Sequence, residues 1–314
     1  MCAYSGMKWE DTKMMLCVQT APILDTFGID EGFRMIAEAG FGGVDFNIDH
    51  AWPGGKIRAN DCSGFFDLSD EEMKEALRPY KEAAEKYGVK FWQAHAPFPT
   101  YVPENSTNEY ILHALKKTIM LMGYLECPNL VVHPGFLGDM DKLPADAEWN
   151  YNVNMYSALI PDLKKYGVVC CLENMFSGYR GKVVEAICSD FDEANAYIDH
   201  LNGVAGERLF GFCLDVGHAT LLGKDIAKVI RTLGDRIVVL HVHDNDGMHD
   251  EHLFPYMGVT NWNRFCAGMK EIGFDKPMSF ETFNALATFD KALWPQMLKL
   301  LYATGELFAE RIAN

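Results

Sequence analysis

The chain has 314 residues, of which 49% are hydrophobic and 23% charged, as is usual for a globular protein. Its 44 acidic residues outnumber its 28 lysines and arginines, and the formal net charge of −16 disfavours nonspecific binding to nucleic acid or to an anionic membrane. No apolar run approaches the roughly 20 residues of a membrane span. Residues 1–14 lack the basic-then-apolar layout of a secretory signal, so we expect a cytoplasmic protein.

Short apolar runs alternate with amphipathic stretches along the chain. Eight runs are short enough, and rich enough in β-branched or aromatic residues, to be strands buried on both faces. They are Met14–Thr20, Gly43–Ile48, Val89–Ala94, Leu130–His133, Val168–Glu173, Leu209–Asp215, Ile237–His243 and Met278–Glu281. The helices predicted between and after them are Asp30–Ala39, Asp70–Tyr87, Asn108–Glu126, Ala145–Tyr166, Asp190–Leu201, Lys224–Leu233, Asn261–Ile272 and Lys291–Ala309.

This alternation indicates an α/β fold of parallel strands joined by helical crossovers. Eight repeats favour a closed (β/α)8 TIM barrel over an open sheet, and no G-x-G-x-x-G motif opens a helix. No linker divides the chain, so residues 1–314 are expected to form a single TIM-barrel domain. Two longer strand-to-helix loops, at about 49–68 and 174–189, are insertions expected on the catalytic face.

Nine cysteines are spread along the chain without a C-x-x-C pair, and several lie inside the predicted strands. This pattern is typical of reduced, buried thiols rather than of a disulfide framework.

Six consecutive predicted strands end in, or just before, His, Glu or Asp residues. A single such residue is more often a capping or loop-ordering residue, but the C-terminal ends of barrel strands converge, so six in succession point to one site. The candidates at these ends are His95, His133, Glu173, Asp215, His218, His243 and Glu281, with Asp250 and His252 in the loop after the seventh strand.

Carboxylates that converge in this way would repel one another and be pushed towards protonation. A bound divalent cation would remove that penalty, and neutral imidazoles would supply further ligands. The nitrogen and oxygen donors without a thiolate suit Zn or Mn, with Mg or Co as further options. His241, which shares a strand with His243, is expected to face the helical layer.

Together these residues resemble the xylose isomerase-like TIM barrel superfamily of sugar and sugar-phosphate isomerases and epimerases, which is related to endonuclease IV. The resemblance extends from about Gly40 to Glu281. In the ketose 3-epimerase branch it implies one metal held by Glu173, Asp215, His243 and Glu281, and the Asp-x-x-His spacing of Asp215 and His218 also matches. The trinuclear zinc site of endonuclease IV implies further ligands at His95, His133, His218, Asp250 and His252.

The sequence also departs from these relatives. Tyr256 and Asn261 stand where glycine and aspartate are usual, and the segment Asp244–Asp250 is shorter than in endonuclease IV. His249 occupies the position of an arginine in the epimerases. We therefore expect substrate contacts that differ from theirs.

The leading hypothesis is a divalent-metal-dependent isomerase or epimerase of a sugar or sugar phosphate, acting by proton transfer through a metal-bound cis-enediolate. Glu173 and Glu281 are the expected catalytic acid/base pair. The candidate substrate contacts are His218, Arg180, Trp52, Phe98, Tyr256 and Trp262.

Three alternatives remain open: an endonuclease IV-like phosphodiesterase acting on abasic DNA, a cyclitol or sugar dehydratase, and a non-catalytic sugar-binding barrel. The expected partner is a small carbohydrate. Binding to nucleic acid is disfavoured, and binding to a membrane is not expected. The sequence leaves open the sugar, and whether the chain forms a homodimer or a tetramer.

Overall fold

The computed structural model describes residues 14–137 and 146–314, where eight parallel strands form one sheet. Each predicted strand overlaps one of them. In chain order they are β1 (Leu16–Gln19), β2 (Gly43–Asn47), β3 (Lys90–His95), β4 (Asn129–Val131), β5 (Val169–Glu173), β8 (Phe210–Asp215), β9 (Ile237–His241) and β10 (Met278–Phe280).

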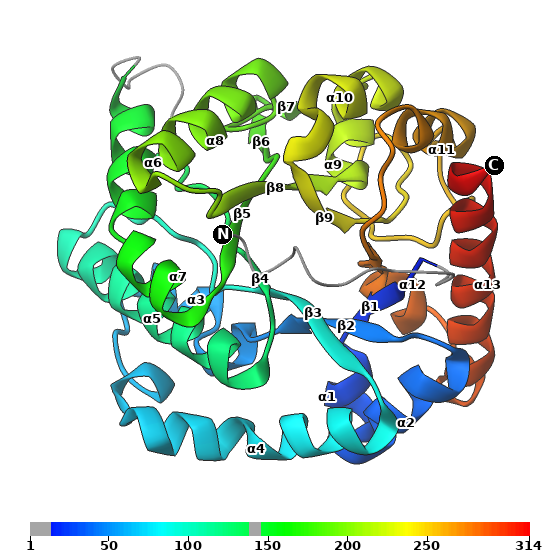
Figure 1. Cartoon of the computed structure of the whole chain (residues 1–314), viewed down its shortest axis with the longest axis horizontal. Coiled ribbons are helices and arrows are strands. Elements are labelled where there is room, and N and C mark those ends of the chain that lie inside the picture. The colour runs from blue at the N-terminus through cyan, green and yellow to red at the C-terminus, as the bar shows by residue number, and fades with distance from the viewer. Residues whose placement is uncertain (1–13, 138–145) are drawn as a thin grey trace.

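The sheet curves into a barrel. Its strand order is β10-β1-β2-β3-β4-β5-β8-β9, and a parallel bridge between Val242 and Phe280 joins the two edges. The helices lie in a ring outside the strands (Figure 1). The predicted (β/α)8 barrel is therefore confirmed.

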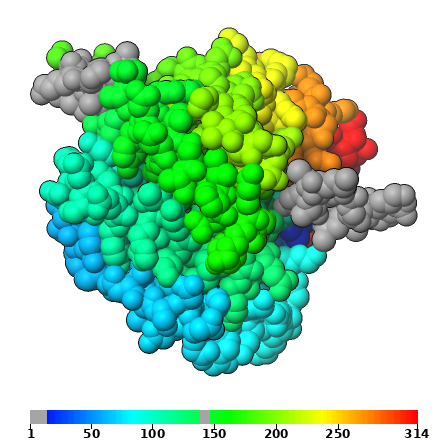
Figure 2. Space-filling view, turned by 60° about the vertical axis from the view of Figure 1, so that its left-hand side comes forward, coloured from blue at the N-terminus to red at the C-terminus, as the bar shows by residue number. Residues whose placement is uncertain are grey.

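Helices cover the outside of the barrel, and seven of the eight predicted helices are present, while the stretch 145–166, whose first residue lies outside the described residues, forms two helices. The described helices are α1 (Ile23–Phe27), α2 (Ile29–Ala39), α3 (Gly54–Arg58), α4 (Asp70–Tyr87), α5 (Asn105–Leu125), α6 (Ala147–Ser157), α7 (Ile160–Tyr166), α8 (Phe191–Ala205), α9 (Val216–Leu221), α10 (Ile226–Leu233), α11 (Trp262–Glu271), α12 (Phe283–Ala287) and α13 (Trp294–Ala313). On the side seen in Figure 2, the blue to green segments pack against one another as a continuous surface.

Local chemistry explains two helix boundaries. The capping box of Ser69 and Glu72 begins α4, and Gly88 ends it in the left-handed region at φ 71°. The stretch predicted as one helix over 145–166 is instead divided into α6 and α7. Pro161 causes the break, because proline fits the first turn of a helix and disrupts the interior.

The two predicted insertions follow strand C-termini, as expected of loops on the catalytic face. The loop after β2 contains α3 and two short 3-10 turns, Asp49–Ala51 and Phe65–Asp67. The loop after β5 forms an antiparallel hairpin of β6 (Phe176–Tyr179) and β7 (Lys182–Glu185).

The eight described cysteines carry free thiols, and seven of them are buried, while Cys2 lies outside the described residues. Cys171 and Cys213 belong to a small apolar cluster on β4, β5, β8 and β9. They precede Glu173 and Asp215 by two positions, so this cluster supports the polar strand ends from below. Over residues 14–137 and 146–314, no helix is long and apolar enough to cross a membrane.

The last helix packs on the first strand through a glycine. A Cβ atom on Gly305 of α13 would lie 2.6 Å from Leu16 Cδ1 and 2.9 Å from Phe280 Cε2. We predict that Gly305→Ala lowers the free energy of unfolding by a net amount on the order of 1–2 kcal/mol, because overpacking outweighs the gain in helix propensity. Urea denaturation measures this change.

Gly203 in α8 supplies the control, because a Cβ atom there meets nothing within 4 Å. Gly203→Ala should raise the free energy of unfolding by about 0.5–1 kcal/mol. Equal stabilisation by both substitutions would contradict the close packing of α13 on the barrel.

Candidate metal centre

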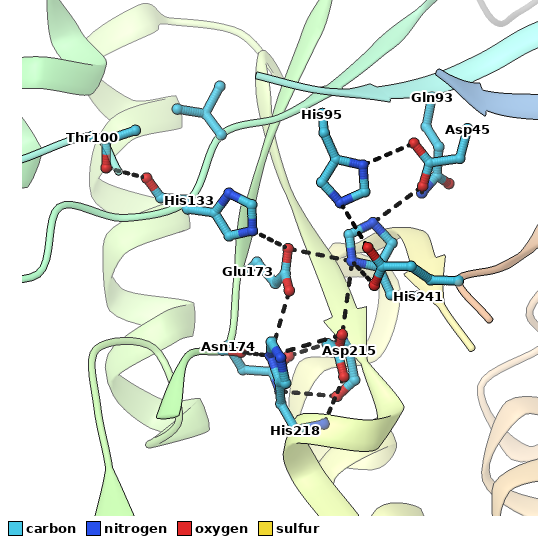
Figure 3. Close-up of polar contacts among 12 residues, drawn as sticks. Asp45, Gln93, His95, Thr100, His133, Glu173, Asn174, Asp215, His218 and His241 are labelled. Atoms are coloured by element: carbon cyan, nitrogen blue, oxygen red, sulfur yellow. Dashed lines mark hydrogen bonds and ion pairs between the residues drawn. The ribbon is translucent and has the colours of Figure 1, made fainter. Parts of the chain in front are cut away.

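Carboxylates from three strand ends surround one imidazole. His241, at the end of β9, places Nδ1 3.3 Å from Glu173 Oε2, 3.5 Å from Glu281 Oε2 and 3.8 Å from Asp215 Oδ2. All four side chains are buried. The amide of Asn174 bonds both the backbone N–H and the carbonyl of Asp215, which ties the ends of β5 and β8 together. Figure 3 shows Glu173, Asp215 and His241 pointing towards a common centre.

The expectation that His241 faces the helical layer is wrong. Residues two positions apart on a strand point to the same side, so His241 and His243 both turn inwards. His243 follows the end of β9, where its Nε2 lies 3.0 Å from Asp215 Oδ2 and its ring stacks on His252 at 4.0 Å. Gly217 allows this position, since a Cβ atom there would lie 1.9 Å from His243 Cε1. His241, not His243, therefore meets all three carboxylates.

His95 ends β3 and His133 follows β4 by two residues, and each contacts one of the two glutamates. His133 Nε2 lies 3.2 Å from Glu173 Oε2, and His95 Nε2 lies 3.3 Å from Glu281 Oε1. The ring of Phe98 lies 4.7 Å from that of His133. His95, His133 and Glu173 each offer a donor atom within 4.8 Å of the others, which suits a metal ion.

A further predicted group lies beside Asp215. Asp215 caps α9, and this places His218 one turn along, with its Nδ1 2.8 Å from the carbonyl oxygen of Asn174. Asp250 Oδ2 lies 3.5 Å from His218 Nε2 and 3.0 Å from His252 Nε2. All nine predicted metal ligands therefore gather at this end of the barrel.

Sequence reasoning missed three buried polar residues that support this group. Gln19 donates to Glu281 Oε1 at 2.7 Å, and Gln93 donates to Asp45 Oδ2 at 2.9 Å. Asp45 also contacts His95 Nδ1 at 3.0 Å. The available signal was a charged or amide residue within a buried apolar strand, which is costly unless it has a partner.

Two carboxylates of the site, Glu173 and Asp215, are held ionised. Burial opposes the negative charge on Glu173, but attraction to His241 outweighs it and keeps the pKa of Glu173 well below its usual value. Burial also opposes the charge on Asp215, and attraction to His218 lowers the pKa of Asp215.

His95 and His252 are correspondingly held protonated when only protein groups surround them. Burial opposes the positive charge on His95, yet attraction to Asp45 raises the pKa of His95 to about 9. Burial has the same effect on His252, and attraction to Glu281 raises the pKa of His252 to about 8. These protons supply the positive charge that the carboxylates need.

Several buried atoms of the group find no hydrogen-bond partner among the described residues. They are Glu173 Oε2, His133 Nδ1, both ring nitrogens of His241, His243 Nδ1 and Asp250 Oδ1. Those of Glu173 and His241 make ion-pair contacts only. Unpaired buried polar atoms are uncommon because each one carries a desolvation cost. Convergent oxygen and nitrogen atoms of this kind fit a divalent cation.

The predicted substrate contacts are not all at the site. Trp52 is buried and donates to the carbonyl of Asp61, and buried Trp262 donates to Asp244, so both indoles serve packing. Tyr256 is 54% exposed, and its hydroxyl accepts from Arg311.

Three further side chains, one arginine and two phenylalanines, lie in the loops of the catalytic face. Arg180 is exposed at the turn of the β6–β7 hairpin. Phe98 alone among the four predicted aromatic contacts adjoins a candidate ligand, His133. Phe176, which was not predicted, contacts the ring of His218 at 4.9 Å.

A cavity of about 320 Å³ opens beside β1 and β2. Asp49 lines it, and burial raises the pKa of Asp49 although attraction to His95 and His133 opposes the rise. The other lining residues are Thr20, Ala21, Leu24, Asp25, Ile29, Phe46, Asn47, His50, Pro53, Gly54 and Tyr80.

Comparison with known proteins places this barrel among relatives. The chain is 28% identical over 234 residues to the uncharacterized protein MJ1311 of Methanocaldococcus jannaschii, which covers 71% of this chain and 73% of that protein. A D-tagatose 3-epimerase-like protein superimposes with a TM-score of 0.66 at 21% identity, covering 93% of this chain and 99% of that one. The 3-keto-D-glucoside 4-epimerase YcjR of E. coli gives 0.68 at 15% identity, covering 93% and 100%.

The family model described as xylose isomerase-like TIM barrel matches residues 33–304, which include all the candidate ligands. The chain belongs to the xylose isomerase-like TIM barrel family.

Proposed function

We propose that the protein is a divalent-metal-dependent isomerase or epimerase of a small carbohydrate. The observation that carries this proposal is the placement of Glu173 and Glu281, from strands on different sides of the barrel, against the same nitrogen of His241. Two carboxylates that face one point can remove a proton from carbon on one side and return it on the other.

Glu173, Asp215, His241 and Glu281 would hold the ion, with His95 Nε2 as a further ligand beside Glu281. His241 would take the place that the sequence assigned to His243. When bound, a divalent ion would supply the positive charge that polarises a sugar carbonyl and its neighbouring hydroxyl. Zn or Mn suits these donors, and Mg or Co are further options.

The proton transfers would then fall to the two glutamates. One carboxylate takes the proton from the carbon next to the carbonyl, and the electron pair of the C–H bond moves towards the carbonyl oxygen to give an enediolate. The other glutamate, which must carry a proton at this step, returns that proton to the opposite face of the carbon and so inverts it. Return of a proton to the neighbouring carbon would instead give the isomer.

The cavity beside β1 and β2 could admit a small substrate, but none of its lining residues is a candidate metal ligand. Its volume of about 320 Å³ lies at the small end of ligand pockets. Its polar lining includes Asp49, Asn47 and Thr20, which suits sugar hydroxyls. Phe98 and Phe176 do not line this cavity, but their contacts with His133 and His218 would let them border a substrate at the metal.

An abasic-DNA phosphodiesterase is the second candidate, favoured by the additional ligand group of His218, Asp250 and His252. Such a group would allow more than one metal ion, which phosphodiester cleavage uses. The excess of acidic over basic residues counts against a DNA substrate. A sugar dehydratase would use the same ligands and base.

Substituting either glutamate tests the proton transfer. We predict that Glu173→Gln and Glu281→Gln each lower solvent-deuterium exchange into the substrate by about 10²–10⁴-fold, because an amide cannot act as the base. The measurement is a screen of ketoses and inososes in D₂O with Mn, Co or Zn, read by mass spectrometry. Loss of water from a substrate would identify the dehydratase instead.

The control is Glu271→Gln, which removes an exposed carboxylate paired with Arg231 far from the strand ends. It should exchange like the unmodified protein. Undiminished exchange in both site variants would refute the assigned roles.

Metal affinity should rise with pH. The pKa values of His95 and His252 are about 9 and about 8, and both rings face Glu281, so a cation bound there would displace the protons that they hold. Affinity should increase by up to about tenfold per pH unit for each proton released, between about pH 6.5 and pH 9. Competition with a chelating dye across this window measures the slope, and a flat profile would contradict it.

The metal-free protein should show the opposite trend. Raised histidine pKa values contribute stability that is complete below about pH 6.5 and is lost as pH rises through about 8 and 9. The melting temperature of the metal-free protein should therefore fall over this range, with the metal-loaded protein falling less.

The DNA alternative has a direct test. A duplex containing a tetrahydrofuran abasic site should remain uncut by the zinc-loaded protein, and metal analysis should show fewer than three ions per chain. Efficient cleavage together with three zinc ions would replace the isomerase proposal with the phosphodiesterase.

A further inference from the structure

Asp45 lies on β2 below the carboxylates and is completely buried. Its Oδ1 is 3.0 Å from His95 Nδ1, and its Oδ2 is 3.3 Å from His241 Nε2. Gln93 Nε2 donates to the same Oδ2 at 2.9 Å. Three nitrogen donors from β3 and β9 thus face one carboxylate, as Figure 3 shows.

The two imidazoles turn opposite nitrogens to Asp45. His95 uses Nδ1 and directs Nε2 at Glu281, whereas His241 uses Nε2 and directs Nδ1 at Glu173. A neutral imidazole has one N–H and one lone pair, and an ionised carboxylate only accepts. When a metal displaces one proton from each ring, the proton that remains would lie towards Asp45 and the lone pair towards the carboxylate cluster, as metal ligation requires.

Neighbouring contacts hold this arrangement in place. The rings of His95 and His241 stack with centroids 4.4 Å apart and planes 18° apart. Gln93 Nε2 also lies 3.2 Å from the carbonyl oxygen of Leu240, the residue before His241. An amide NH₂ can only donate, so Gln93 keeps Asp45 Oδ2 in its accepting role and links it to the backbone of β9.

We propose that Asp45 is a positioning residue of the metal centre, which holds His95 and His241 together in the tautomers that present a lone pair to the ion. This inference rests on the proposed function, since it requires a divalent ion at the carboxylate cluster. Both oxygens of Asp45 already face nitrogen donors, so Asp45 acts on the ion through the two rings.

The isosteric variant Asp45→Asn tests this role. The new NH₂ group faces one ring as a donor, so that ring must accept and its proton moves to the nitrogen that faces the metal. The dissociation constant for Zn or Mn, measured with a competing chelator, should rise about 10–100-fold. The visible spectrum of the Co-loaded variant should also change, because one imidazole leaves the coordination sphere.

Ser279→Ala is the matched control. Ser279 is buried on β10, two residues before Glu281, and its hydroxyl has no hydrogen-bond partner among the described residues. This variant should keep the affinity and the Co spectrum of the unmodified protein. Thermal unfolding of each metal-free variant separates loss of the fold from loss of the metal.

Gln93→Met provides a second variant, which also covers the case that Asp45→Asn does not fold. It removes a donor to Asp45 and leaves both histidines, so the affinity should fall in the same direction by a smaller factor. If the unmodified protein binds metal and the folded variants keep its affinity and its Co spectrum, that result would overturn the role of Asp45 but not the proposed function. An unmodified protein that binds no divalent metal would overturn the proposed function as well.

Discussion

The mutual repulsion of buried carboxylates is the constraint on which this end of the barrel depends. Glu173, Asp215 and Glu281 all lie close to one nitrogen of His241, in surroundings from which water is largely excluded. Isolated buried charges are too costly to persist, so each must have a partner. The partners come from neighbouring strands as imidazoles and amides, and their protons provide the compensating charge. A divalent cation would supply the same charge in a smaller volume.

The sequence predicts the barrel well because two independent patterns agree. Strands buried on both faces are continuously apolar, and their alternation with amphipathic helices leaves few possible folds. The ligands could be predicted because parallel strands bring their C-terminal ends together, whatever the details of packing. Glu173 and Asp215 needed no knowledge of side-chain contacts to be recognised as neighbours.

The remaining features depend on contacts that the sequence does not express. Asp45 lies within a strand, and its role follows from rings that approach it across the barrel. Trp52 and Trp262 lie in loops on the catalytic face, but whether a loop indole packs inwards or borders a site depends on the cavity left by its neighbours. The position of His241, in contrast, could have been predicted from the sequence. Alternate residues of a strand point to the same side, so His241 must face inwards together with His243.

Similarity to sugar epimerases of known structure, at 15–21% identity, establishes the fold, while the loops distinguish this chain. The loop after β2 lines the cavity through Asp49, and the hairpin after β5 brings Phe176 against His218. Substrate selection on the proposed function would therefore reside in these two loops, and the strand ends would supply a chemistry common to many substrates.

The hydrogen bond between Gln19 and Glu281 joins residues 262 positions apart. The β-bridge between Val242 and Phe280 closes the sheet next to this hydrogen bond. Contacts this distant in sequence form late, because the entropy of closing so long a loop must first be overcome. A chain still being synthesised would possess most of the donor atoms without their final geometry. On the proposed function, ion capture would thus be a property of the completed barrel rather than a nucleus around which it folds.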